Sequence, residues 1–198
     1  MTIQHPVVLE DEHILLLPLD AAHFDALIAI GQAPEIWTHL SIDGFMPDVL
    51  MTELKAALIK RATREQYPFT IVDKRTGAII GSTRMYNVFP EHRKLEIGWT
   101  WYSPDYWGTG CNTACKLLLL TYCFETLGTV RVQLQTREQN LRSRAAIEKL
   151  GAKLEGILRN DRIRKDGISR NTALFSIIDS EWPAVKQGLQ QQLTDRGF

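Results

Sequence analysis

The sequence predicts an α+β domain built on a mixed, mostly antiparallel sheet. Three strand-like segments, 69–72, 79–86 and 95–102, follow one another with short connections, which is typical of an antiparallel meander. A strongly apolar helical segment, 112–127, separates this meander from further strand-like segments. Because a helix between strands is the usual crossover to a parallel neighbour, the sheet should contain a parallel pair. At 198 residues, without a linker or repeat, the chain fits one domain.

The N-terminal third predicts a short hairpin followed by two helices. Residues 7–19 contain two apolar clusters separated by acidic residues and a histidine, which indicates a strand or a hairpin of two short strands. Asp20 can cap a helix that ends by Gly31 and Pro34. Pro47 then opens a second helix. The core-facing residues expected on the two helices are Phe24, Leu27, Ile28, Leu50, Leu54, Ala57 and Leu58.

The third strand of the meander, 95–102, alternates along its length, as a strand in a sheet does. The residues expected to face the core are Leu95, Ile97, Trp99 and Trp101. The opposite face should carry Glu96, Gly98, Thr100 and Tyr102.

The C-terminal half predicts three more strands and two helices. Segment 130–136 alternates like a strand, and a short helix after it stops at Gly151. Two last strands flank a turn at 165–167, and they are expected at 154–164 and 170–178. A helix from residue 181 follows them.

A glycine-containing turn, Trp107-Gly108-Thr109-Gly110, lies between strand 95–102 and the apolar helix. Glycines let the backbone approach a ligand, and the first N–H groups of a helix have no partners within it, so this arrangement can bind an anion. Gly-x-Gly is also common in ordinary turns, and both interpretations stay open. The Lys-Ser/Thr pair of a nucleotide P-loop is missing, as is the third glycine of a dinucleotide fingerprint.

At these residues the chain resembles the GNAT superfamily of N-acetyltransferases, in its RimJ/RimL branch. The family's acetyl-CoA loop, Gln/Arg-x-x-Gly-x-Gly/Ala, matches residues 107–112 at Gly110, while Trp107 replaces its first residue and Asn112 its small last one. The resemblance covers nearly the whole chain. Three further motifs occur in family order: Glu96-Ile97-Gly98-Trp99, Asn140-Leu141-Arg142-Ser143 before a helix ending Glu148-Lys149-Leu150-Gly151-Ala152, and Ser180-Glu181-Trp182-Pro183.

This resemblance implies a GNAT-like sheet with helices on both faces, whose two central parallel strands, 95–102 and 130–136, splay apart. It implies transfer of an acetyl group from acetyl-CoA directly to a primary amine in a ternary complex, without a metal. The amides of pantetheine would pair with a splayed strand, and Gly98 leaves the backbone open to that approach. The residues implied for coenzyme binding are Ile97, Gly98, Trp99, Gly108, Gly110, Cys111, Asn112, Thr113, Asn140 and Ser143.

Glu96 and Ser143 are the candidate catalytic residues. Glu96 is expected to act as a general base through water, because the attacking amine must lose a proton. The alternative is an exposed strand carboxylate paired with Arg84 or Arg131. Ser143 is the candidate acid for the departing thiolate, or an ordinary serine in the first turn of a helix. Asn140 binds the pantetheine arm, caps the helix, or does both.

Trp37, His39 and Phe45 are the candidate acceptor-binding residues, since the loop between the first two helices usually shapes the acceptor site in this family. The aromatic residues alternatively pack the loop on the core. Between Arg159 and Arg170, five basic and two acidic residues surround a turn. They form either a solvated hairpin or a lip that steers an acidic acceptor to the cleft. Protein N-termini and small amines both remain as acceptors.

Composition narrows the function classes. The formal net charge is zero, which argues against a non-specific nucleic-acid binder. Three cysteines without a C-x-x-C pair favour small buried side chains over a disulfide framework or zinc site, and the histidines lack metal spacing. We find neither an N-terminal signal nor an apolar run of membrane-spanning length. We therefore expect a cytoplasmic protein without a membrane partner.

Two other function classes stay open beside the transferase. A non-catalytic acyl-CoA-binding module would keep the glycine turn but would not use Glu96 and Ser143. A plain interaction domain would have no affinity for CoA. The sequence does not decide the assembly state, and a homodimer is left open.

Overall fold

The computed structural model describes residues 1–4, 6–163 and 167–198. Within them the chain forms an eight-stranded sheet in the order β1-β2-β3-β4-β5-β6-β8-β7. Neighbouring strands are antiparallel except for the parallel pair β5 and β6. The strands are β1 (Leu9–Glu10), β2 (Ile14–Pro18), β3 (Gln66–Asp73), β4 (Ala78–Phe89), β5 (Lys94–Tyr102), β6 (Arg131–Arg137), β7 (Lys153–Ile163) and β8 (Ser169–Ile178).

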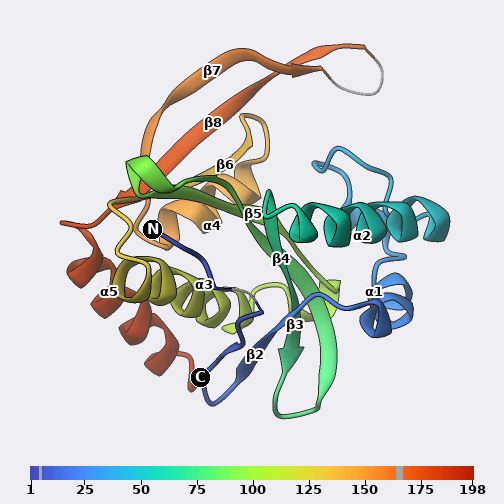
Figure 1. The fold of residues 1–198 in the computed structure, drawn as a ribbon, viewed down its shortest axis with the longest axis horizontal. Helices are drawn as coiled ribbons and strands as arrows, with labels where there is room; N and C mark the ends of the chain where they lie inside the picture. The colour runs from blue at the N-terminus through green and yellow to red at the C-terminus, as the bar shows by residue number, and fades with distance from the viewer. Residues whose placement is uncertain (5, 164–166) are drawn as a thin grey trace.

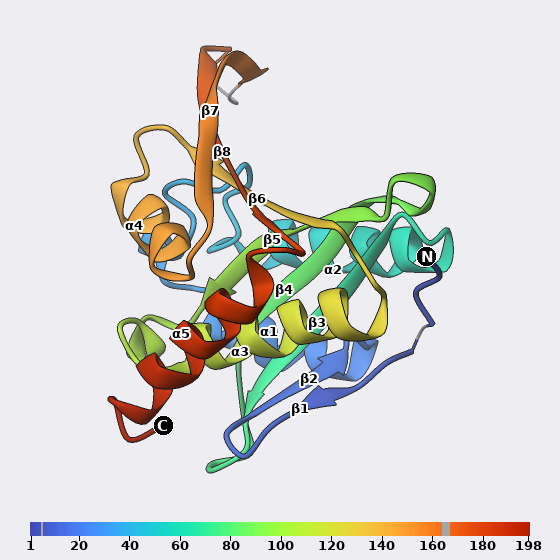
Figure 2. The same ribbon diagram turned by 90° about the vertical axis from the view of Figure 1, so that its left-hand side faces the viewer.

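Helices cover both faces of this sheet (Figures 1 and 2). The α-helices are α1 (Phe24–Ile30), α2 (Pro47–Ala62), α3 (Cys111–Thr121), α4 (Leu141–Lys149) and α5 (Trp182–Thr194). A larger core joins the sheet to α3, α4 and α5, and a smaller core joins it to α1 and α2. This arrangement confirms the predicted mixed, mostly antiparallel sheet with helices on both faces.

The N-terminal elements follow from local capping chemistry. Residues 7–19 form the predicted hairpin, because β1 pairs with β2. Asp20 accepts a hydrogen bond from the Ala22 N–H (3.0 Å) and starts a 3₁₀ turn that leads into α1. Pro47 opens α2 as expected. The predicted turn at 165–167 falls mainly on residues outside the described part of the chain.

The central parallel strands separate, as predicted. Among the described residues, β5 and β6 pair at Lys94–Arg131, Leu95–Val132 and Glu96–Gln133, and then diverge. Beyond this point β5 continues to Tyr102 and β6 to Arg137 without pairing to each other. The diverging ends leave backbone N–H and C=O groups facing a gap in the middle of the sheet.

A β-bulge in β5 corrects the predicted alternation of that strand. Trp99 has φ +51°, and the β4–β5 register advances by two residues on β4, from Arg84 to Ser82, against three on β5, from Gly98 to Trp101. The extra residue turns the later side chains over. Leu95 and Ile97 lie in the larger core, whereas Trp101 lies in the smaller core and Tyr102 in the larger one.

Candidate functional site

The gap between β5 and β6 opens into a cavity of about 340 Å³. One side, which we call the turn side, is lined by Trp107 and Gly108 from the segment that leads into α3, and by Asn112 in its first turn. The other, the hairpin side, is lined by arginines from β6, β7 and β8. Trp99, Thr100, Leu134 and Gln135 come from the diverging strands between the two sides, so the splay itself forms the cavity.

The turn side presents free backbone donors at the start of α3. Gly108 has φ +75°, a conformation that strains other residues, so a glycine is required there. The Cys111 N–H donates to Thr109 Oγ1 at 3.3 Å. Within the described chain, no hydrogen bond engages the N–H groups of Asn112 and Thr113. The two free donors lie at the positive end of the helix dipole and suit an anion.

Gly110 has a different reason to be glycine. Its φ of −71° is accessible to any residue, but a Cβ there would lie 2.4 Å from Cδ2 of Phe198. The Phe198 ring also packs 4.5 Å from the ring of His13, and Arg196 Nη1 donates to the Gly108 carbonyl at 2.7 Å. The segment after α5 therefore supports the glycine turn from behind, away from the cavity. Close approach to Phe198 requires the small residue at Gly110.

Glu96 lies in the sheet with 1% of its surface exposed. Its carboxylate accepts hydrogen bonds from the Tyr86 hydroxyl, from Asn87 Nδ2 at 3.0 Å and from Gln133 Nε2 at 3.0 Å. Burial raises the pKa of Glu96, while these donors partly oppose the shift. The expected alternative partners are engaged elsewhere, since Arg84 pairs with Glu53 and Arg131 with Glu155.

Tyr86 connects this carboxylate to the cavity. The phenol ring lines the cavity, and its hydroxyl donates to Glu96 and lies 3.5 Å from Gln135 Nε2. Burial, together with the neighbouring Glu96 charge, raises the pKa of Tyr86, so the phenol stays protonated. A Cβ on Gly98 would lie 2.8 Å from the Tyr86 oxygen. Gly98 therefore makes room for Tyr86, which differs from the role expected for it in approaching a ligand.

Asn140 and Ser143 come together at the start of α4 and both line the cavity. The Asn140 side chain caps the helix by accepting from the Ser143 N–H at 3.1 Å. The cap uses the amide oxygen and leaves the amide nitrogen to face other groups. Arg142, between them, stacks its guanidinium 3.8 Å from the centroid of the Trp107 ring, and this contact links α4 to the glycine turn.

The candidate acceptor residues separate in the structure. His39 lines the cavity, and its pKa is lowered by burial and by the charges of Arg137 and Arg142. Trp37 is 4% exposed and packs in the smaller core, where its Nε1 donates to the Gly31 carbonyl at 2.6 Å. Phe45 is 38% exposed and is not among the residues around the cavity. Of the three, the structure brings His39 to the site.

Lys116 is a buried cation that the sequence analysis did not single out. It lies on α3 with 4% of its surface exposed and borders the cavity. Its Nζ donates to Thr100 Oγ1 at 2.5 Å and to Thr83 Oγ1 at 3.2 Å. Among the described residues, no carboxylate pairs with it, and burial lowers its pKa. In the sequence, a single lysine within an otherwise apolar helical segment was the pattern that could have indicated a buried cation.

Replacing Lys116 by Met should stabilise the fold at neutral pH. The pKa of Lys116 is lower in the folded chain than the value of about 10.4 expected when it is unfolded, so the unfolded chain binds the proton more strongly. The contribution of Lys116 to the free energy of unfolding therefore rises with pH between its lowered pKa and about 10.4, by at most about 1.4 kcal/mol per pH unit. Urea unfolding at several pH values gives the free energy of unfolding of the wild type and of Lys116→Met. The difference between the two should narrow as pH rises. A difference that does not change with pH would contradict a lowered pKa of Lys116 in the folded protein.

Other residues at the site could not be predicted from the sequence, because they come together only through strand pairing. Tyr86 stands opposite Glu96 only because of the β4–β5 register, which a chain pattern does not reveal. Arg137, Arg162 and Arg170 come from three strands that become neighbours only in the folded sheet. The basic composition of segment 159–170 was a signal for the last two.

Residues 1–4, 6–163 and 167–198 contain neither a metal-binding cluster nor a membrane-spanning helix. No group of three or more His, Cys, Asp or Glu side chains in them is arranged to hold a metal ion. None of the helices formed by them has the length and apolarity needed to span a membrane. The three cysteines are free and buried on the central helical segment, as predicted.

Comparison with protein families gives a match over most of the chain. The acetyltransferase (GNAT) domain matches residues 13–153. YdaF of Bacillus subtilis, which carries the provisional name of a ribosomal N-acetyltransferase, is 33% identical over 110 residues. That alignment spans 56% of this chain and 59% of YdaF. The N-acetyltransferase p20 of Bacillus licheniformis, an uncharacterised protein, is 24% identical over 86% of this chain and 96% of its own length.

Solved structures give the same result for the fold. A GCN5-related N-acetyltransferase from Brucella melitensis superposes with a TM-score of 0.88 and 30% identity, covering 95% of this chain and 86% of that one. RimJ of Mycobacterium smegmatis, in complex with CoA-disulfide, superposes with a TM-score of 0.79 at 20% identity, covering 97% and 96%. With the family match and the splayed sheet, these likenesses identify the chain as a member of the GNAT family of acetyltransferases, and therefore as an acyltransferase.

Proposed function

We propose that the protein transfers an acetyl group from acetyl-CoA directly to a primary amine, in a ternary complex. The observation that carries this proposal is the cavity between the diverging strands β5 and β6, with free helix N–H groups on one side and Tyr86 in its wall. Acetyl-CoA supplies the activated acetyl group, and the residues of the chain position it and move protons.

The site fits CoA in two respects. The N–H groups of Asn112 and Thr113 suit its pyrophosphate, and those of Gly108 and Gly110 lie in the same turn. The unpaired edges of β5 and β6, beside Trp99 and Leu134, suit the amide groups of its pantetheine arm. Asn140 offers its amide nitrogen to the same arm. The remaining coenzyme candidates, Ile97 and Cys111, support this frame from the core.

Tyr86 and Glu96 provide a route for the proton that the amine must lose. The amine nitrogen would bond to the acetyl carbon and pass a proton to the Tyr86 oxygen, while the Tyr86 proton moves to the Glu96 carboxylate. The raised pKa of Glu96 makes it a better proton acceptor than an exposed carboxylate. The carbon–sulfur bond breaks, and Ser143, which lines the cavity, donates a proton to the departing thiolate and regains one from solvent.

We also propose a place within the RimJ/RimL branch. The support is the motif order, the YdaF relative and the likeness of fold to RimJ. On this proposal the acceptor is the α-amine of a protein N-terminus, with small primary amines as the alternative. The reference pKa of an α-amine, about 7.7–8.0, means that a single buried carboxylate is enough to deprotonate it.

The test is release of free CoA thiol from acetyl-CoA in the presence of N-terminal peptides, polyamines and amino acids. The expected result is release that depends on the added amine, with one acetyl group gained by that amine for each thiol. Binding of CoA by calorimetry without release with any amine would support the non-catalytic module instead. Absence of CoA binding would contradict the whole assignment.

A further inference from the structure

Three arginines face the hairpin side of the cavity. Arg137 ends β6, while Arg162 on β7 and Arg170 on β8 stand directly opposite each other in the antiparallel register. Thr172, two residues from Arg170, pairs with Arg137 across β6 and β8. Adjacent strands thus carry the three guanidinium groups to one wall, and all three residues border the cavity.

Among the described residues, Asp161 is the carboxylate that acts on Arg162 and Arg170. Asp161 accepts from Thr172 Oγ1 at 2.7 Å and lies 3.4 Å from Arg162 Nε. Arg137 is directed to the carbonyls of Thr38 and Leu40 at 3.4 and 3.2 Å. In the described part of the chain, the Arg170 side chain has neither a hydrogen bond nor an ion pair, although it is half-buried and feels the charge of Asp161. The two arginines of β7 and β8 therefore outnumber the carboxylate beside them, and the Arg170 guanidinium is available to a ligand.

Ionisation at the site agrees with this geometry. The pKa of Arg170 is lowered by burial, and further by the charges of Arg137 and Arg162. The pKa of His39, across the cavity mouth, is lowered by burial and by two arginines. Like charges at close range repel each other, and an anion bound among them would relieve that cost.

We infer that Arg170, supported by Arg137 and Arg162, binds a carboxylate carried by the acceptor, so that the enzyme prefers amines bearing an acidic group. This inference rests on the proposed function, because the acceptor must enter the cavity from the hairpin side. Guanidinium groups recognise carboxylates through paired hydrogen bonds, which are stronger between charged groups than between neutral ones. The acceptor is an acidic peptide N-terminus or a free acidic amino acid.

The first experiment compares matched acceptors with the wild-type enzyme. Ser-Glu-Ala-Ala-amide and Ser-Gln-Ala-Ala-amide differ in one charge, and free glutamate tests the amino-acid source. We expect kcat/KM for the acidic peptide to exceed that for the neutral peptide by about tenfold or more, since tenfold corresponds to about 1.4 kcal/mol. Salt should reduce this ratio. Equal use of the two peptides would overturn the inference while leaving the acetyltransferase function intact.

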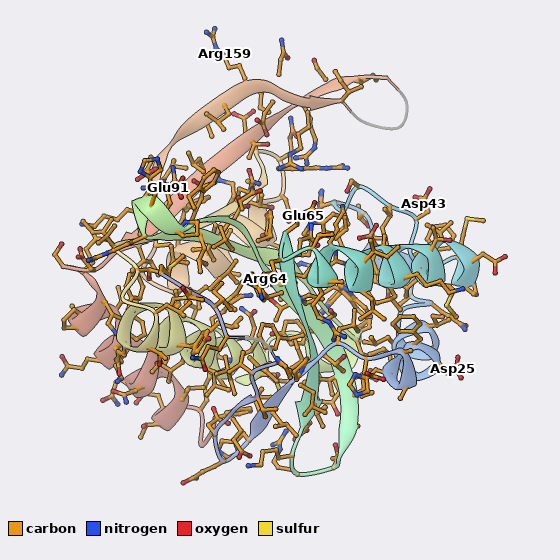
Figure 3. All side chains as sticks on the ribbon, viewed as in Figure 1. Asp25, Asp43, Arg64, Glu65, Glu91 and Arg159 are labelled. Carbon is orange, nitrogen blue, oxygen red and sulfur yellow. The ribbon has the colours of Figure 1, made fainter. Side chains whose placement is uncertain are left out.

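The second experiment uses Arg170→Gln, with Arg159→Gln as the matched control. Arg159 is exposed on the same hairpin and points away from the body of the protein (Figure 3). Arg170→Gln should lower kcat/KM about tenfold for the acidic peptide and less than about twofold for the neutral one. Arg159→Gln should change neither value. An equal loss for both peptides would indicate a structural role and contradict the inference.

Calorimetric binding experiments test the carboxylate site independently of the proposed acetyltransferase activity. The acidic peptide is titrated into protein saturated with CoA, where no transfer is possible. Tighter binding of the acidic peptide, lost in Arg170→Gln, supports the carboxylate site even if the enzyme shows no turnover. Equal binding of both peptides contradicts the site even if turnover is observed.

Discussion

Tyr86→Phe is expected to lower kcat by about 100-fold or more, with the dissociation constant of CoA unchanged. The substitution keeps the ring that packs over Gly98 and removes the hydroxyl between the cavity and Glu96. General acid–base groups contribute roughly 10²–10⁴ in rate, and the proton route is lost without this hydroxyl. Steady-state kinetics and CoA calorimetry measure the two quantities. A kcat within about threefold of wild type would remove Tyr86 from the mechanism.

Glu96→Gln is the matched control for this result. The amide has the shape of the carboxylate, but it cannot accept the proton. In the wild type, activity should fall as pH drops through the raised pKa of Glu96, because the carboxylate must be ionised to accept a proton. In Glu96→Gln, kcat should be low and this acid limb should disappear. A variant that retains the wild-type pH profile would show that another group titrates.

Gly110→Val should weaken CoA binding by about tenfold or more, and the loss should depend on Phe198. The added Cβ would lie 2.4 Å from the Phe198 ring, so either that ring or the glycine turn must move. Movement of the turn displaces the free N–H groups of Asn112 and Thr113. Calorimetric titration with CoA measures the loss, and circular dichroism shows whether the fold is retained.

The double variant Gly110→Val with Phe198→Ala separates the packing explanation from a direct effect on the ligand. Removing the ring opens space behind the turn, so CoA affinity should recover to within about threefold of Phe198→Ala alone. An unrelieved loss would mean that the valine side chain acts on the coenzyme site itself. That outcome would contradict the view that Gly110 is needed for contact with Phe198.

The architecture was predictable because its signals are local or follow from simple topology. A glycine turn between a strand and an apolar helix is visible at residues 107–128, and strands on both sides of a helix require a crossover. The splay followed from the family resemblance and is present from Leu134 onward on β6. Asn140, which lies between β6 and α4, was recognisable as a helix cap.

The details of the site depend on contacts between distant segments, and these were not predictable. The bulge at Trp99 adds one residue to β5, so a strict alternation placed Trp101 on the face of Leu95 and Ile97, whereas it lies in the smaller core. The sequence indicated the importance of the glycines but not the side chains that require them. Gly98 contacts Tyr86, and Gly110 contacts Phe198, only in the folded chain. Pairing across strands likewise determined the partner of Glu96.

The central claim is that CoA binds between β5 and β6 with its pyrophosphate on the turn before α3. Hydrogen–deuterium exchange of the protein with and without CoA tests this most directly, because backbone N–H groups are the proposed ligands. We expect CoA to slow exchange in segments 97–102, 108–114 and 134–137, and to leave α2 (Pro47–Ala62) unchanged. Saturating CoA that leaves exchange in those three segments unchanged would contradict the account.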